Sequence, residues 1–257
     1  MSPARVAGAL LGATLVLFIV GPLLRLLWEA SPATLASAAA DEEVRDAIGL
    51  TILAASTATA IALLLGVPLG YVLARYRFPG SGLLRGILDL PVVVPHPVAG
   101  IALLLFLGRQ SAIGGALGRA GLEIVSHIPG IVAAMLFVSA PLLVSGAREA
   151  FASVDPKLER VARTLGDSGW TAFRRVTLPL AGRGIVAGAL LAWGRSVSEF
   201  GAIVILAYHP KVASILIFDR FTLYGLPAAV PVAALLLLVA LAVFILLRWL
   251  EPRRAPR

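Results

Sequence analysis

Long, uninterrupted runs of apolar residues dominate the chain, in place of the amphipathic stripes of a soluble fold. A bilayer core of about 30 Å requires about 20 apolar residues, because a helix rises about 1.5 Å per residue. The runs of this length predict six membrane-spanning helices, at about 6–28, 47–74, 88–108, 128–147, 180–207 and 226–250. We therefore expect an all-α, polytopic membrane protein in which residues 1–257 form a single transmembrane domain.

The first apolar run is either a retained membrane helix or a cleaved secretory signal, because Arg5 precedes it and secretory signals also begin with basic residues. The run from Val6 to Leu24 is long for the core of a signal, and no clear small-residue cleavage site follows it. A retained first helix is therefore favoured over a cleaved signal.

Composition supports lipid as the solvent. Of 257 residues, 59% are hydrophobic and 14% are charged, whereas soluble domains are about half apolar and about a quarter charged. The absence of cysteine excludes disulfides and thiolate metal sites. His96, His127 and His209 have no ligand spacing, so no metal site is predicted.

Lys and Arg are distributed unevenly between alternate connections. They gather at 75–85, at 148–183 and at the C-terminus, where Arg253, Arg254 and Arg257 lie. Because short cytoplasmic loops are enriched in basic residues, this pattern predicts that both termini are cytoplasmic. Much of the net charge of +8 is then a signal of topology, so a nucleic-acid partner is not expected.

The longest connection, 148–179, is predicted to be cytoplasmic and to contain a short amphipathic helix. Asp155 is suited to cap a helix whose first residue is Pro156, and Gly166 supplies a left-handed end. A second short helix that includes Trp170 should follow. The apolar face carries Leu158, Val161, Ala162 and Leu165, and the opposite face carries Lys157, Glu159, Arg160 and Arg163.

Amphipathicity alone leaves open whether this helix lies on the inner leaflet or docks on a partner. The run from Gly166 to Leu178 and Pro179 resembles the EAA loop of ABC importer permeases, although Arg160 stands where that family usually has glutamate and Glu159 lies one position early. The resemblance implies that the segment from 155 to 169 is a coupling helix that docks on an ATPase. Its candidate residues are Asp155, Leu158, Glu159, Arg160, Ala162, Arg163, Gly166 and Trp170.

No P-loop is present, since Lys157 and Lys211 each follow a proline and not a glycine-rich turn. The resemblance therefore implies that ATP and Mg²⁺ bind to a separate ATPase. This chain is then a transport subunit without a cofactor of its own, and not a complete enzyme.

Two charged residues interrupt the fifth predicted span. Arg195 and Glu199 are four residues apart, and Arg195 lies about 17 Å along a helix counted from Gly184, near the middle of the bilayer. Charges at this depth face a protein interior or a water-filled cavity. A pathway or gate is favoured over a purely structural ion pair, and Ser198 and His96 are further candidates for its lining.

The residues around Arg195 and Glu199 carry a more specific resemblance, to one branch of the ABC importer permeases. The segment from Trp193 to Ala202 resembles the fifth-helix signature of molybdate, tungstate and sulfate permeases, and 90–100 resembles their third helix, although His96 replaces a usual proline. Segments 109–114 and 207–233 are similar to the molybdate and tungstate members. The resemblance implies a type I ABC importer of molybdate or tungstate in the cytoplasmic membrane of a prokaryote. It would be a permease homodimer with two ATPase subunits and an external oxyanion-binding protein.

Three alternatives stay open. Sulfate or thiosulfate would be handled by a similar pore, whereas an ion-coupled secondary transporter usually has internal repeats, of which we find no convincing example. A membrane scaffold would leave Arg195 and Glu199 without a role. Four basic residues on the outer side either attract an anion, contact a binding protein or are ordinary surface charges: Arg109, Arg119, Lys211 and Arg220.

Overall fold

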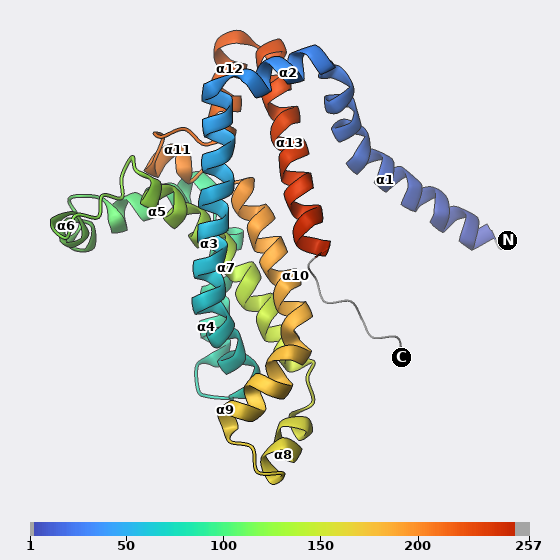
Figure 1. Cartoon of the computed structure of the whole chain (residues 1–257), viewed down its shortest axis with the longest axis vertical. Helices are drawn as coiled ribbons and strands as arrows, with labels where there is room; N and C mark the ends of the chain where they lie inside the picture. Colours follow the sequence, from blue (N-terminus) through green and yellow to red (C-terminus); the bar gives the residue numbers. More distant parts are fainter. Residues whose placement is uncertain (1–2, 250–257) are drawn as a thin grey trace.

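The computed structural model describes residues 3–249, which are helical with no β-strand. Three long helices form the centre (Figure 1): α3 (Glu42–Arg75), α7 (Ile128–Ala152) and α10 (Leu178–Val197). Helix α13 (Leu226–Trp249) lies beside them, and α1 (Pro3–Glu29) leans away from the bundle. The protein is thus a helical bundle from which one helix, α1, diverges.

Shorter helices occupy the two ends and one side of the bundle. Helices α2 and α12 lie at one end, α8 and α9 lie at the other, and α5 and α6 project on the side opposite α1 (Figure 1). Their bounds are α2 (Pro32–Ala40), α4 (Ser81–Val93), α5 (His96–Leu107), α6 (Ala112–Arg119), α8 (Pro156–Thr164), α9 (Gly169–Ala172), the π-helical turn η1 (Phe173–Thr177), α11 (Ile203–Leu206) and α12 (Ala213–Tyr224).

Five helices in the described range are long and apolar enough to cross a membrane, and the bent pair of α4 and α5 brings the number to six if it counts as one span. Residues 88–108 were expected to form one span, but they belong to two helices, and the chain bends by 114° between them. Pro95 lies at the break and disfavours helical backbone in Val94 before it, whereas Pro97 lies in the first turn of α5, where a missing N–H donor is tolerated.

The fifth span also differs from the prediction of 180–207. Helix α10 ends at Val197, and an irregular segment leads to the short α11. Arg195 therefore lies in the last turn of α10 and not at its middle, and Glu199 lies beyond the helix. Part of the physical reason is local: the Glu199 carboxylate accepts a hydrogen bond from the N–H of Ala202 at 2.7 Å, which closes the turn before α11.

The other predicted spans lie largely within α1, α3, α7 and α13. Helix α3 is longer than expected, with 34 residues, because the side chain of Asp41 caps its first turn. The predicted end of the sixth span at Leu250 lies outside the described residues, as do Arg253, Arg254 and Arg257.

Helix α7 packs on α3 and α10 through small residues. A Cβ atom built on Gly70 of α3 would lie 2.8 Å from the Cβ of Ala147, and one built on Gly184 of α10 would lie 2.5 Å from the Cβ of Ala150. Membrane helices associate through dispersion contacts, and small residues let their backbones approach closely. These two glycine–alanine contacts define the seams that hold the three central helices together.

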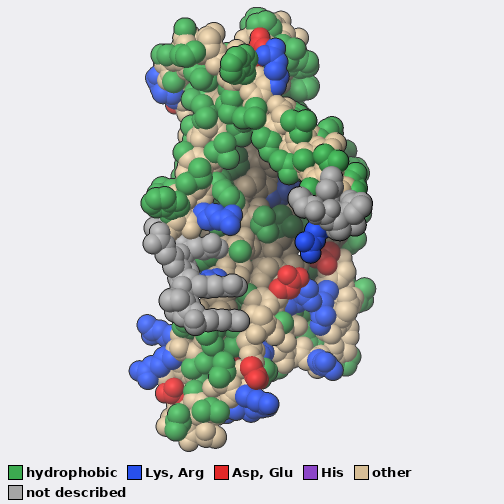
Figure 2. Space-filling model, turned by 90° about the vertical axis from the view of Figure 1, so that its right-hand side faces the viewer, with side chains coloured by type: hydrophobic (Ala, Val, Ile, Leu, Met, Phe, Trp, Pro, Cys, Tyr) green, Lys and Arg blue, Asp and Glu red, His purple; other side chains and the backbone are tan. Residues whose placement is uncertain are grey.

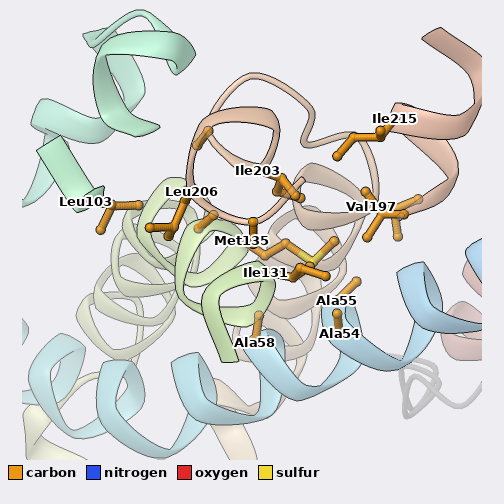
Figure 3. Close-up of a cluster of buried hydrophobic side chains, with 14 of the residues drawn as sticks. Ala54, Ala55, Ala58, Leu103, Ile131, Met135, Val197, Ile203, Leu206 and Ile215 are labelled. Atoms are coloured by element: carbon orange, nitrogen blue, oxygen red, sulfur yellow. The ribbon is translucent and has the colours of Figure 1, made fainter. Parts of the chain in front are cut away.

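A second packed region lies where the bent α5 and the short α11 reach the bundle. Figure 3 shows Ile131 and Met135 of α7 between Ala54 of α3 and the side chains of Ile203 and Leu206. All five side chains are buried. The irregular segment after α10 is thus held in the core and does not lie loosely on the surface.

We predict that Gly184→Ala lowers the unfolding temperature of the detergent-solubilised protein. The added methyl group must displace Ala150, and overpacking of this kind costs about 1–3 kcal/mol. Gly182→Ala is the matched control in the same helix, because its added Cβ has nothing within 4 Å. Since alanine favours a helix over glycine, the control should leave the temperature unchanged or raise it. Equal behaviour of the two variants would contradict the importance of the seam.

Candidate functional site

Arg195 is the centre of a polar cluster inside the apolar bundle. Its Nη2 donates to Oε2 of Glu199 at 2.7 Å and lies 2.7 Å from Nε2 of His96. Its Nη1 donates to the hydroxyl of Ser198 at 3.3 Å. The four residues predicted to line a pathway therefore meet at one place, although His96 comes from α5 and the others from the end of α10 and the segment beyond it.

His96 can accept a hydrogen bond from the guanidinium only through an unprotonated ring nitrogen. Its backbone is held by the close approach of Gly201, where a built Cβ would lie 2.6 Å from the Cβ of His96. A glycine at 201 thus permits the contact between α5 and the segment after α10.

Glu199 is fully buried, whereas the side chain of Arg195 is 22% exposed. Besides the bond from Arg195, the Glu199 carboxylate accepts a hydrogen bond from the N–H of Ala202. The backbone carbonyl oxygen of Glu199 accepts one from the hydroxyl of Ser214 at 2.8 Å. A buried charge needs such partners to offset its desolvation. Glu199 therefore fixes the junction of α10, α11 and α12, and Arg195 is the member of the pair that remains accessible.

The amphipathic helix predicted in residues 148–179 is present with the predicted ends. The Asp155 side chain accepts from the N–H of Lys157 at 2.8 Å, α8 begins at Pro156, and Gly166 has a φ of +102°. Ser168 caps the next short helix through the N–H of Thr171. The local structure predicted for this segment is confirmed.

The apolar side chains of this segment lie in solvent at the far end of the molecule. Leu158, Leu165 and Trp170 are 47%, 83% and 69% exposed. A contiguous exposed apolar patch marks a surface that binds another molecule. Arg160 and Arg163 are also exposed, as predicted for the charged face.

Glu159 does not share that charged face. Its Oε2 accepts from the hydroxyl of Thr177 at 2.9 Å, and its Oε1 accepts from the hydroxyl of Tyr71 at 3.4 Å. Both partners belong to the membrane bundle, so the expected exposure of Glu159 is corrected. Sequence reasoning misses Tyr71 and Thr177, because a polar residue near the end of an apolar run occurs at many helix ends and carries no distinguishing signal.

Three of the four basic residues predicted for the outer side form ion pairs. Arg109 pairs with Glu123 at 3.0 Å. Arg220 pairs with Asp41 at 2.7 Å, and Lys211 pairs with Asp219 at 2.8 Å. These last two pairs join α12 and the loop before it to the start of α3 and to each other, so these cations are engaged within the subunit.

The pKa values of the acidic partners reflect this engagement. The hydrogen bond from Arg220 lowers the pKa of Asp41 below its ordinary value. Burial raises the pKa of Asp219, but hydrogen bonds from Lys211 and Tyr208 outweigh burial, so this pKa also lies below its ordinary value. Both carboxylates are thus ionised at neutral pH. Residues 3–249 contain no group of three His, Cys, Asp or Glu side chains that could hold a metal.

The chain matches a known family of transport proteins over most of its length. The family described as "Binding-protein-dependent transport system inner membrane component" matches residues 66–256, a range that includes the α8–α9 segment and the Arg195 cluster. The chain belongs to this family. It is therefore a multi-pass permease subunit, and the resemblance to ABC importer permeases is confirmed.

Curated relatives cover nearly the whole permease. It is 46% identical over 214 residues to the molybdate/tungstate transport system permease protein WtpB of Thermococcus kodakarensis, covering 83% of this chain and 81% of the relative. The protein of the same name from Pyrococcus furiosus is 45% identical over 249 residues, with 95% and 93% covered. The sulfate transport system permease protein CysT of Escherichia coli is 32% identical over 215 residues, with 82% and 78% covered.

Solved structures support the fold. A bacterial ABC transporter involved in the import of alginate has a TM-score of 0.69 at 20% identity, covering 96% of this permease and 95% of that chain. The methionine ABC transporter MetNI, in inward-facing conformations, has a TM-score of 0.60 at 15% identity, with 80% and 91% covered. The predicted type I ABC importer fold is thus confirmed.

We predict that the Arg195–Glu199 pair shows strong coupling in a double-mutant cycle. Glu199→Gln alone leaves the guanidinium without its counter-ion and should cost about 3 kcal/mol, the lower end for breaking a buried pair, because Arg195 is partly exposed. The double variant Arg195→Met with Glu199→Gln removes both charges. Its thermal unfolding in detergent should be closer to that of the wild type than the sum of the two single variants predicts. Additive effects would show that the pair does not act as a unit.

Proposed function

We propose that this permease imports molybdate or tungstate across the cytoplasmic membrane of a prokaryote, driven by separate ATPase subunits. The observation that carries the proposal is the 45% identity to a molybdate/tungstate permease over 95% of this chain. The sulfate permease of Escherichia coli is more distant, at 32% identity. A cationic side chain inside the bundle suits the passage of an anion.

Two copies of the permease form the pathway at their shared interface. The support is that Arg195 and Ser198 are open on one side of a single subunit, where a guanidinium facing acyl chains would be costly. Apolar surface is also uncovered: the most apolar stretch of α1 has no buried residue, and α4 has none. Figure 2, seen from the side of α1, shows a hollow at the centre of this face beneath a mostly hydrophobic upper half.

In this arrangement Arg195, Ser198 and His96 line or gate the route of the anion. A transport site must bind strongly enough to admit an ion and weakly enough to release it. Glu199 lies buried beside Arg195 and neutralises it in part, which keeps a dianion from being trapped. A single guanidinium that is paired with a carboxylate of the same subunit is consistent with a site that an anion passes through, and not with a site that retains it.

An ATPase subunit docks on the exposed side chains of α8 and α9 of each permease. ATP-driven closure of the two ATPases draws these segments together and opens the outer gate, and ADP release resets it. ATP and Mg²⁺ are bound by the ATPase. An external binding protein delivers the anion to the end formed by α2 and α12, which is the outer end in this arrangement. The N- and C-termini and residues 148–179 are then on the cytoplasmic side.

Uptake into vesicles tests the substrate. We expect vesicles that contain the permease, its ATPase and its binding protein to take up tungstate and molybdate when ATP is supplied, and an excess of sulfate to compete poorly. Sulfate that competed as well as tungstate would contradict the substrate assignment and favour the sulfate or thiosulfate alternative. An ion-coupled carrier or a scaffold is distinguished by purification, because neither would bring down a stoichiometric ATPase.

Gly166→Pro tests the coupling segment. Proline cannot adopt the φ of +102° found here, so the turn between α8 and α9 must change. We predict that the variant is still inserted in the membrane and still supports ATP hydrolysis, but that its ATP-dependent uptake falls to near background. Gly182→Ala, which lies outside the docking segment and meets nothing within 4 Å, is the control and should transport normally. Normal uptake by Gly166→Pro would refute the coupling role.

A further inference from the structure

The α8 helix is attached to the membrane bundle on one side by three polar contacts. Glu159 accepts from Thr177 and Tyr71, as described above. At the base of the helix, Nη1 of Arg75 donates to the carbonyl oxygen of Val154 at 3.0 Å. Tyr71 and Arg75 belong to the inner end of α3, and Thr177 directly precedes α10.

Glu159 is the only one of these residues that joins α8 to both long helices. A carboxylate has two oxygens, and here each oxygen serves a different element: one the hydroxyl on α3, the other the hydroxyl next to α10. Thr177 is fully buried, so its hydroxyl has little access to water as a replacement partner. The contact therefore depends on the position of α8.

The partner on α3 is itself fixed. The ring of Tyr71 packs edge-on against Phe151 and Phe173, with ring centroids 5.2 Å and 4.9 Å apart. Such a ring cannot follow a moving carboxylate by changing its rotamer without leaving this cluster. The Thr177 side lies in the π-helical turn η1, an irregularity of the kind that is frequent at functional sites.

The two faces of α8 thus have different chemistry. Arg160 and Arg163 are exposed and available to a partner, whereas Glu159 faces the bundle. We infer that Glu159 is a positioning residue that transmits movement of α8 to α3 and α10, and that it does not bind the ATPase. This inference rests on the proposed function, because it assigns a route for the energy that the ATPase delivers.

The test is reconstitution of the permease, its ATPase and its binding protein in liposomes with tungstate as the substrate. The two readouts are the ratio of ATPase to permease after purification and the ATP hydrolysed per tungstate imported. For Glu159→Ala we expect an unchanged subunit ratio and a rise of about 2- to 30-fold in ATP hydrolysed per tungstate, the range found for single residues that carry coupling.

Conservative variants separate transmission from a general loss of structure. Glu159→Gln retains an acceptor oxygen and should lie between the wild type and Glu159→Ala. Thr177→Val removes one hydroxyl with little change of shape and should raise the ATP cost on its own. When combined with Glu159→Ala it should add little, because both variants break the same contact.

Arg160→Ala is the control on the exposed face, and it should reduce the amount of bound ATPase without raising the ATP cost of the complexes that remain. The inference is overturned if Glu159→Ala behaves like Arg160→Ala, or if Glu159→Ala and Thr177→Val both leave the ATP cost unchanged. Failure of the wild-type complex to import tungstate with ATP would instead overturn the proposed function, and the inference with it.

Discussion

The contact of α7 with α3 and α10 constrains every other part of the molecule. At Gly70 and Gly184 no side chain stands between the helices, so that one added methyl group would collide with an alanine on α7. Close-packed helices of this kind cannot slide past one another by small rotamer changes, and they respond to a force as a unit. Helix α10 begins beside Thr177 and carries Arg195 in its last turn. The same packed unit therefore includes the contact with α8 at one end and the polar cluster at the other. Under the proposed function, a displacement at Glu159 reaches Arg195 along the single helix α10.

The polar cluster shows how the bundle tolerates charge. Glu199 is fully buried, and its partners are Arg195, the N–H of Ala202 and the hydroxyl of Ser214. The bonds from Arg195 and from the N–H of Ala202 satisfy the carboxylate, and the bond from Ser214 to the backbone carbonyl oxygen of Glu199 helps to hold the irregular segment between α10 and α12. The interpretations of the ion pair as structural and as part of a pathway are thus not exclusive. Glu199 is the buried, structural member, and under the proposed function Arg195 is the partly exposed member that faces the second subunit and water.

The sequence predicts the positions and ends of most helices well, but it predicts poorly how the helices and their side chains are oriented in the folded chain. The ends of α8 follow from Asp155 and Gly166, because capping and left-handed backbone are properties of a few neighbouring residues. The long apolar helices likewise follow from length and composition. Pro95 and Glu199 contribute locally to the break after α4 and to the early end of α10, but the directions that α5 and α11 then take depend on how they pack on the core, which no local pattern reveals. Glu159 illustrates the limit: a helical projection places it with Arg160 and Arg163, and only the folded chain shows that Tyr71 and Thr177 turn it inward.

Ion pairs at the end of the bundle opposite α8 extend the packed unit. Arg220 with Asp41, and Lys211 with Asp219, tie α12 and its preceding loop to the start of α3, the same helix whose inner end contacts Glu159. Under the proposed function, α3 therefore connects the ion pairs at its start to the coupling segment as one continuous helix, with Pro68 in its interior. Alternating access is then more consistent with rocking of the whole packed unit against a second subunit than with bending inside one subunit. The elements outside the seams that bury no side chain, α4 and the most apolar stretch of α1, are those free to adjust as the two units move.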